Sequence, residues 1–240
     1  YWLIGNEPNV DGQDNVSADY YSGELAYYFS TIKGADSTAK IVGPNILNWN
    51  QICNNSCDGF QSGHSWVDGF RAAWAAGHLG AEPPFDVWAL HAYQIDWYHL
   101  PMTDPAQQEG DIGAMSAYLG AIPASASKPI WLSEFGVLWA YDGFNYMPNG
   151  SCQAGTNCIG PIGPYDQAAV TSWMNSFDGW LAANAATKRM QRWFLYTSFG
   201  LPEPYATVYG GVSVVTSINP GAPLSPSGEI YRQQSLMPVP

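Results

Sequence analysis

The sequence predicts an α/β fold, TIM-barrel-like, in which about five strand–helix units follow one another within a single domain. First, apolar strand-like runs alternate strictly with segments that carry apolar residues at helical spacing. Second, the runs have no polar face, as residues 85–90 and 193–196 illustrate, which is typical of parallel strands covered on both sides. Third, no linker rich in Pro, Gly or Ser divides residues 1–240, a length sufficient for one large core.

The first half of the chain is expected to contain two complete units and the strand of a third. Residues 1–5 are a short apolar run typical of a strand, and residues 18–33 carry apolar residues at helical spacing. Residues 40–44 form a short β-rich run, and a helix is expected near residues 65–76 after a loop rich in Gly, Asn and Ser. Residues 85–93 are the third expected strand.

The second half continues the alternation. A helix is expected around residues 111–122, a strand at 129–135 and, after a long loop, a helix at 165–185. Residues 192–199 are the last clear strand, and residues 228–234 are expected to form a short closing helix. This order fits an eight-stranded barrel or an open doubly wound sheet. No Gly-rich phosphate loop follows any strand, which favours the barrel.

The charge balance excludes some classes of partner. The chain has 20 acidic and 8 basic residues and a formal net charge of −12. Nucleic acids and anionic membrane surfaces both require basic patches, so neither is an expected partner. Aromatic residues make up 15% of the chain. Their flat rings suit stacking on sugars, although most are expected in the core.

The four cysteines form two close pairs in Gly/Asn/Ser-rich segments. The favoured pairing is local and joins Cys53 to Cys57 and Cys152 to Cys158, because each loop then closes on itself at little entropic cost. A zinc site is the rival, but the spacing differs from that of zinc ribbons and no histidine lies beside the pairs. Disulfides would place the protein outside the cytoplasm, at the cell surface or secreted.

Other motifs give weaker signals. Residues 11–15 are acidic enough to suggest a calcium loop but lack the alternating ligands and distal Glu, so a solvated turn is expected. The four histidines have no metal-ligand spacing, and no Gly-x-Ser-x-Gly elbow of a serine hydrolase is present. The sequence therefore predicts neither a metal nor a cofactor.

Two glutamates follow apolar strand-like runs and are the candidate catalytic residues. Glu7 follows residues 1–5, and Glu134 lies near the end of residues 129–135. Carboxylates at strand ends lie at the rim where α/β folds build active sites. Glycosidic bond cleavage needs two such groups, one to protonate the leaving oxygen and one to attack or stabilise the sugar cation. Glu7 would have to hold a proton, which apolar residues around Trp2 would favour.

Strand periodicity predicts where these side chains point. At a two-residue period Glu134 shares a face with Leu132 and Ile130, and Glu7 shares one with Leu3. Each carboxylate is therefore expected to continue the inner face of the sheet. Strand ends across a barrel mouth can reach the separation of about 5–5.5 Å that a retaining mechanism needs, so retention is expected.

The motifs Asn6-Glu7-Pro8 and Trp131-Leu132-Ser133-Glu134-Phe135-Gly136 resemble those of the clan A retaining glycoside hydrolases. The resemblance implies a (β/α)8 barrel in which Glu7 is the acid/base and Glu134 is the nucleophile. It also implies that Asn6 binds the sugar 2-hydroxyl.

The same resemblance implies roles for several aromatic or imidazole side chains. His91 and Tyr93 match the end of the clan's sixth strand, where a ring orients the nucleophile or contacts the sugar. Tyr196, or alternatively Trp193, falls on the eighth strand, where an aromatic floor for the sugar is common. Trp139 begins one of two aromatic loops, residues 94–102 and 139–161, that would line an open cleft.

If residues 1–5 are the clan's fourth strand, its first three strand–helix units and its second-strand Arg have no counterpart here. The chain would then be N-terminally truncated, would associate with another copy or a second chain at the open sheet edge, or would be a reduced barrel. The predicted function is retaining, endo-acting hydrolysis of a neutral β-linked poly- or oligosaccharide. The alternative is a non-catalytic carbohydrate-binding or structural extracellular protein with a degenerate barrel.

Overall fold

A computed structural model of the chain describes residues 1–50, 61–95, 104–137, 167–197, 213–215, 217 and 219–235. Five strands form one sheet in chain order, and every neighbouring pair is parallel. The strands are β1 (Trp2–Leu3), β2 (Ile41–Leu47), β3 (Val87–Gln94), β4 (Ile130–Val137) and β5 (Met190–Leu195). The helices are α1 (Ala18–Ala35), α2 (Gly63–Gly77), α3 (Ala106–Gly120), α4 (Gln167–Asn184) and α5 (Pro226–Ser235). The predicted alternation of five strand–helix units is confirmed.

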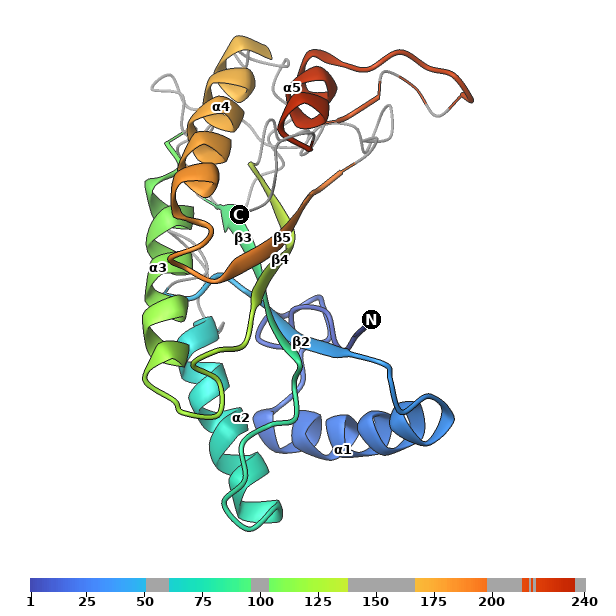
Figure 1. Cartoon of the computed structure of the whole chain (residues 1–240), viewed down its shortest axis with the longest axis vertical. Coiled ribbons are helices and arrows are strands. Elements are labelled where there is room, and N and C mark those ends of the chain that lie inside the picture. Colours follow the sequence, from blue (N-terminus) through green and yellow to red (C-terminus); the bar gives the residue numbers. More distant parts are fainter. Residues whose placement is uncertain are drawn as a thin grey trace.

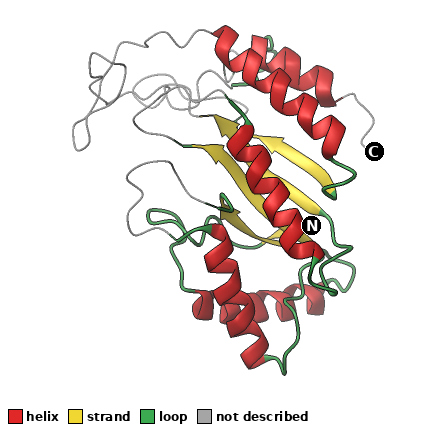
Figure 2. Ribbon diagram, turned by 90° about the vertical axis from the view of Figure 1, so that its left-hand side faces the viewer, coloured by secondary structure: helices red, strands yellow, loops and turns green. Residues whose placement is uncertain are grey.

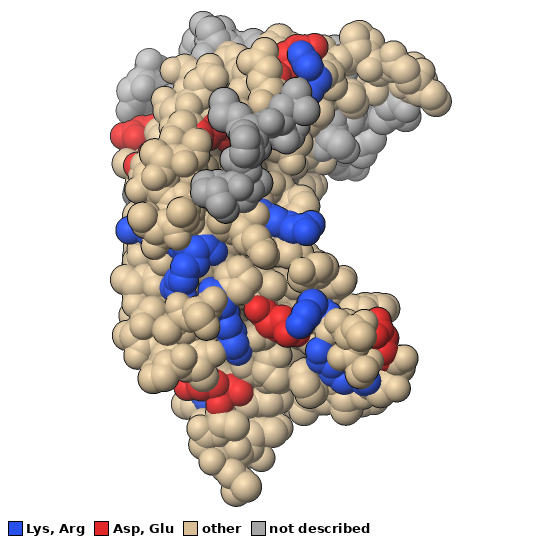
Figure 3. All heavy atoms as spheres, in the orientation of Figure 1, with Lys and Arg blue, Asp and Glu red and all other residues tan. Residues whose placement is uncertain are grey.

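The sheet curls into an incomplete (β/α) barrel. Helices α2, α3 and α4 run along one face of the sheet, while α1 lies at the end near β1 and β2 (Figures 1 and 2). The main core lies between the sheet and these helices, and it includes Trp66, Phe70, Trp88, Trp173 and Phe177. The opposite face is concave, and the molecular surface is hollowed there, between α1 and the segment that carries α5 (Figure 3).

Local chemistry explains where the first two helices begin. The Ser17 hydroxyl accepts a hydrogen bond from the Tyr20 amide, and the Ser62 hydroxyl accepts one from the Ser65 amide. Each serine therefore satisfies an amide that the first helical turn leaves unpaired. Asp19 and Lys33 lie in the first and last turns of α1, where their charges complement the helix dipole.

The two edge strands differ most from the sequence prediction. β1 covers only Trp2–Leu3, because Gly5 has a φ of 81° and leaves the extended conformation. Tyr1, Trp2 and Leu3 are 60, 55 and 50% exposed, so the expected buried strand is in fact an exposed edge. Trp2 therefore does not form a buried wall beside Glu7. β5 ends at Leu195 rather than at residue 199. The expectation that this strand is buried on both faces is also wrong, since Phe194 is 41% exposed.

Two strands each contain one extra residue relative to β3. Asn45 lies where the β2–β3 register shifts between Pro44 and Ile46. Ser133 has no β3 partner, because Leu90 pairs with Leu132 and His91 pairs with Glu134. Such bulges interrupt the two-residue alternation of side chains.

The bulge at Ser133 corrects the predicted placement of Glu134. Ile130 and Leu132 pack in the core on the helix side of the sheet, whereas Trp131 packs on the inner side with Val42 and Ala89. Strict alternation would send Glu134 to the helix side, and the extra residue returns it to the inner face. The expectation that Glu134 shares a face with Leu132 and Ile130 is therefore wrong, although it does reach the inner face.

Several predicted features lie outside the described residues. These include the four cysteines, Trp139 and residues 96–102 and 139–161 of the two aromatic loops. Among the helices that the structure describes, none is long and apolar enough to cross a membrane.

Candidate active site

Glu7 lies in the loop after β1 and is held by the backbone of β2. Its φ is 51°, in the left-handed region, and its amide donates to the Asn45 carbonyl at 2.9 Å. Two residues later, the Asn9 side chain accepts from the Leu47 amide at 3.0 Å and donates to the Leu47 carbonyl at 2.9 Å. These bonds fix a short loop against the end of β2, so the position of Glu7 is defined although no regular strand carries it.

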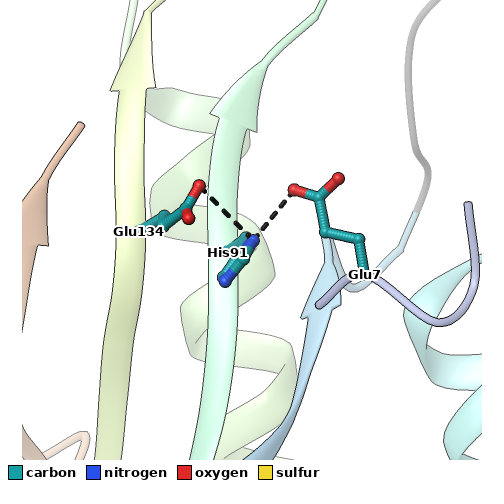
Figure 4. A group of neighbouring side chains, drawn as sticks. All are labelled: Glu7, His91 and Glu134. Carbon is teal, nitrogen blue, oxygen red and sulfur yellow. Dashed lines mark hydrogen bonds and ion pairs between the residues drawn. The ribbon is translucent and has the colours of Figure 1, made fainter. Parts of the chain in front are cut away.

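His91 on β3 lies between the two glutamates. Its Nδ1 is 2.8 Å from Glu7 Oε1 and 3.6 Å from Glu134 Oε2 (Figure 4). With its proton on Nδ1, the ring donates to the Glu7 carboxylate. His91 is almost fully buried, so this contact is shielded from water.

Glu134 on β4 points toward the same imidazole from the opposite side (Figure 4). Its Oε2 accepts a hydrogen bond of 2.9 Å from the Tyr93 hydroxyl. Tyr93 and His91 are two residues apart on β3, so both side chains reach the inner face. One strand therefore supplies the group that contacts Glu7 and the group that contacts Glu134.

The two carboxylates are close together and differ in burial. One ligand atom from each of Glu7, His91 and Glu134 can be chosen so that all three lie within 4.8 Å of one another. The Glu7 side chain is 10% exposed and that of Glu134 is 31% exposed. The same three groups are the one cluster in the described part of the chain that could offer three ligands to a metal ion.

The mouth of the site is closely packed on the β5 side. The rings of Tyr93 and Tyr196 meet edge to face with centroids 6.4 Å apart, and the Tyr196 amide donates to the Phe135 carbonyl at 2.9 Å. A Cβ at Gly136 would lie 3.0 Å from the Tyr93 ring and 3.1 Å from the Tyr196 carbonyl oxygen. Glycine at this position thus allows the two tyrosines to approach each other.

The structure brings together most, but not all, of the predicted site residues. Glu7, His91, Tyr93 and Glu134 form one contact network, and Tyr196 borders it. Asn6 is exposed, and its side chain donates to Gln13 Oε1 at 2.9 Å. The position of Trp139 remains a prediction. The alternative aromatic, Trp193, packs against the helix-side core.

Sequence reasoning missed the polar residues that join the strand ends. Besides Asn45 and Ser133, the side chain of Asn48 exchanges two hydrogen bonds of 2.9 Å with the Tyr93 backbone. One available signal was that Asn45 interrupts the apolar run of residues 41–47. The bulges themselves have no sequence signature that could have predicted the partners of these side chains.

Comparisons with known proteins agree with this arrangement. Residues 1–199 match the model of the glycosyl hydrolase catalytic core family. Among solved structures, the chain is similar to a GH128 (subgroup II) endo-β-1,3-glucanase from Pseudomonas viridiflava, with 20% identity and a TM-score of 0.58. A GH51 α-L-arabinofuranosidase from Thermotoga petrophila RKU-1 gives 16% identity and a TM-score of 0.54. A glucosidase from Croceicoccus marinus gives 13% identity and a TM-score of 0.53.

These similarities differ in how much of each protein they cover. The alignments with the glucanase and the arabinofuranosidase each include 96% of this chain, and the alignment with the glucosidase includes 88%. They include 68% of the glucanase, 38% of the arabinofuranosidase and 35% of the glucosidase. At these identities the structural likeness concerns the fold. No curated protein matches the chain in sequence.

Proposed function

Because the chain belongs to the glycosyl hydrolase catalytic core family, we propose that it hydrolyses O-glycosidic bonds in a β-linked poly- or oligosaccharide with retention of configuration. The observation that carries this proposal is the short distance between the two carboxylates. One oxygen of Glu7 and one oxygen of Glu134 lie within 4.8 Å of each other. Retaining glycosidases place their carboxyl groups about 5–5.5 Å apart, whereas inverting ones need about 6.5–9.5 Å to admit a water molecule.

In the first step, Glu134 attacks the anomeric carbon while Glu7 donates its proton to the leaving oxygen. The glycosidic C–O bond breaks and a glycosyl ester forms on Glu134. In the second step, ionised Glu7 takes a proton from water, the resulting hydroxide equivalent attacks the same carbon, and Glu134 leaves as a carboxylate. Two displacements restore the original configuration.

The surroundings of each carboxylate support these roles. Glu134 is the more exposed of the two, and the Tyr93 hydroxyl donates to it, which stabilises the negative charge of a nucleophile. Glu7 is more buried and lies against the His91 ring, so its carboxyl group is held in a fixed position from which it can transfer a proton to the leaving oxygen. His91 positions the acid/base by its contact with Glu7 Oε1.

The concave face supports a polymeric substrate. The molecular surface is hollowed between α1 and the segment that carries α5 (Figure 3), and an open hollow of this kind suits binding within a polysaccharide chain rather than at its tip. Tyr196 is 39% exposed at the border of the site and can stack on a sugar ring. Asn6 is proposed to bind the 2-hydroxyl once its contact with Gln13 opens. A neutral polymer suits the net charge of −12.

Hydrolysis by the 240-residue chain tests this function. A panel of β-linked polysaccharides would be incubated with the protein, and β-1,3-glucan comes first because the Pseudomonas neighbour is named an endo-β-1,3-glucanase. We expect product release by the wild type and none by Glu134→Gln. Glu109→Gln, on α3, is the matched control and keeps full activity. Carbohydrate binding without hydrolysis would favour the non-catalytic alternative.

We also propose that the protein acts outside the cytoplasm with two local disulfides, Cys53–Cys57 and Cys152–Cys158. The support is the close spacing of each pair in the sequence. Peptide mapping under non-reducing conditions would show both links. Four free thiols in protein purified from the extracellular medium would contradict the proposal.

A further inference from the structure

Asn45 contacts both of the segments that carry the proposed catalytic carboxylates. Its Nδ2 donates to the carbonyls of Ile4 at 3.1 Å and Gly5 at 2.9 Å, just before Glu7. Its Oδ1 accepts from the Ser133 hydroxyl at 2.7 Å, one residue before Glu134. Its own carbonyl accepts from the Glu7 amide at 2.9 Å.

The bulges make this contact possible. Asn45 and Ser133 are the two bulge residues: each lacks a partner in β3 although the residues on both sides of it are paired, and β3 lies between the strands that carry them. A hydrogen bond between their side chains therefore spans the middle strand on the inner face. It joins β2 to β4 independently of the sheet's backbone ladder.

The link is buried and its chemistry is specific. Asn45 is 1% exposed, so each of its polar atoms depends on these partners rather than on water. The two carbonyls of Ile4 and Gly5 need a donor, which an aspartate would not provide. The φ of 57° at Asn45 belongs to the left-handed region, where asparagine and glycine are better tolerated than other residues.

We propose that Asn45 and Ser133 form a positioning pair that sets the distance between the Glu7 and Glu134 carboxylates. Asn45 acts through the Glu7 loop, and Ser133 acts through the strand position next to Glu134. Neither residue is assigned a contact with the sugar. The proposal rests on the two-carboxylate function given above and adds the residues that maintain its geometry.

Steady-state kinetics of three variants test the pair. Asn45→Gly removes the side chain but permits the positive φ, Ser133→Ala removes the hydroxyl, and the third variant combines them. We expect kcat to fall about 10- to 100-fold in each single variant, because a misplacement of about 1 Å can cost that much, while KM changes less than about threefold. Since both changes break the same bond, Ser133→Ala should cost little more in the Asn45→Gly background.

Two matched controls separate positioning from a general loss of hydrogen bonds. Asn184→Ala removes one amide donor to Trp180 at the end of α4, and Ser30→Ala removes a hydroxyl donor to Tyr27 on α1. Both should retain wild-type kcat. Circular dichroism at the assay temperature shows whether each variant is folded. Folded Asn45→Gly with unchanged kcat, or fully multiplicative losses in the double variant, would overturn the proposal.

A measurement without substrate distinguishes this proposal from the function on which it rests. The ring-nitrogen resonances of His91 report its contacts with both carboxylates, so a long-range ¹H–¹⁵N spectrum should change in Asn45→Gly and remain unchanged in Asn184→Ala. If the wild type hydrolyses nothing but this change occurs, the function fails and the positioning pair stands. An unchanged His91 spectrum in folded Asn45→Gly refutes the pair.

Discussion

The two proposed catalytic carboxylates have different surroundings although both approach one imidazole. Glu7 is held on a backbone turn by Asn45 and contacts His91, whereas Glu134 is more exposed and receives the Tyr93 hydroxyl. The asymmetry matches the division between a proton donor and a nucleophile.

This division predicts that Glu7→Gln depends on the leaving group. The variant should lose about 10²- to 10⁴-fold in kcat/KM on a natural polysaccharide, the usual contribution of general acid catalysis. On an aryl glycoside with an acidic phenol, the glycosylation step should be much less affected, because that leaving group needs no proton. Glu134→Gln should be inactive on both. Equal losses of Glu7→Gln on both substrates would show that Glu7 is not the acid.

Removing the Tyr93 hydroxyl should weaken the nucleophile's support without removing the nucleophile. Tyr93→Phe deletes a 2.9 Å hydrogen bond to Glu134, and a bond to a charged group contributes about 1.5–3 kcal/mol. We expect kcat/KM to fall roughly 10- to 100-fold. The exposed Tyr27→Phe on α1 is the control. Wild-type kinetics in Tyr93→Phe would remove Tyr93 from the mechanism.

Sequence patterns identify side chains whose position follows from a strand end, and they fail where a bulge intervenes. Glu7, His91, Tyr93 and Glu134 each occur at the end of an apolar run, so their convergence on one rim is predictable. Asn45 also follows an expected strand, but its role in the network could not be predicted, because the partners of its side chain lie 40, 41 and 88 residues away.

The packing of α4 against the rest of the fold includes a buried acid without a full set of partners. Asp178 lies on α4, and its Oδ2 has no hydrogen-bond partner. Burial raises the pKa of Asp178 to about 7. Across the α4–α5 contact, burial also raises the pKa of Tyr231, and the negative charge of Asp178 raises it further.

Asp178 makes the protein's stability depend on pH. In the unfolded chain its pKa is about 3.8, so between pH 4 and 7 the folded state binds the extra proton. The free energy of unfolding should therefore fall as pH rises through this window, by on the order of 3 kcal/mol between pH 5 and pH 8. In urea unfolding, the free energy of unfolding of Asp178→Asn should fall less than that of the wild type between these two pH values, and the difference should be about the same 3 kcal/mol.

The exposed Asp19→Asn on α1 serves as the control and should keep the wild-type pH dependence. If Asp178→Asn and the wild type lose the same stability between the two pH values, the buried charge is not the cause. Asp111, whose pKa burial raises to about 6, contributes in the same direction in both proteins.

The order of the elements was predictable, whereas several of their ends were not. Alternating periodicities locate all five strand–helix units because each apolar run is separated from the next by a helical segment. Yet α3 begins at Ala106, five residues before the expected start at 111, because Pro105 and the Asp104 carboxylate, which accepts from the Ala106 amide, start the helix. Such short-range contacts are hard to recognise in a polar loop.

The incomplete barrel leaves apolar surface beside β1. A groove of about 700 Å³ lies between β1 and α1, and Trp2, Ile4, Tyr20 and Tyr28 are among its lining residues. β1 pairs with β2 on one edge, and no strand of the described residues pairs with its other edge. Exposed apolar edges of this kind favour association.

We predict that the 240-residue chain self-associates through this edge. Sedimentation velocity should show a larger species that grows with protein concentration, and Leu3→Lys should be monomeric with an unchanged circular dichroism spectrum. Leu79→Lys is the matched control, since Leu79 is fully exposed at the far end of α2 and should not alter association. A wild type that stays monomeric at high concentration would refute the prediction.

The configuration of the first product tests most directly whether Glu7 and Glu134 act as a retaining pair. ¹H NMR of a β-linked substrate during early hydrolysis would follow the anomeric protons before mutarotation. Because one oxygen of Glu7 and one of Glu134 lie within 4.8 Å of each other, we predict that the β-anomer appears first and the α-anomer later. Initial appearance of the α-anomer would require an inverting site, and it would contradict the assignment of Glu134 as the nucleophile.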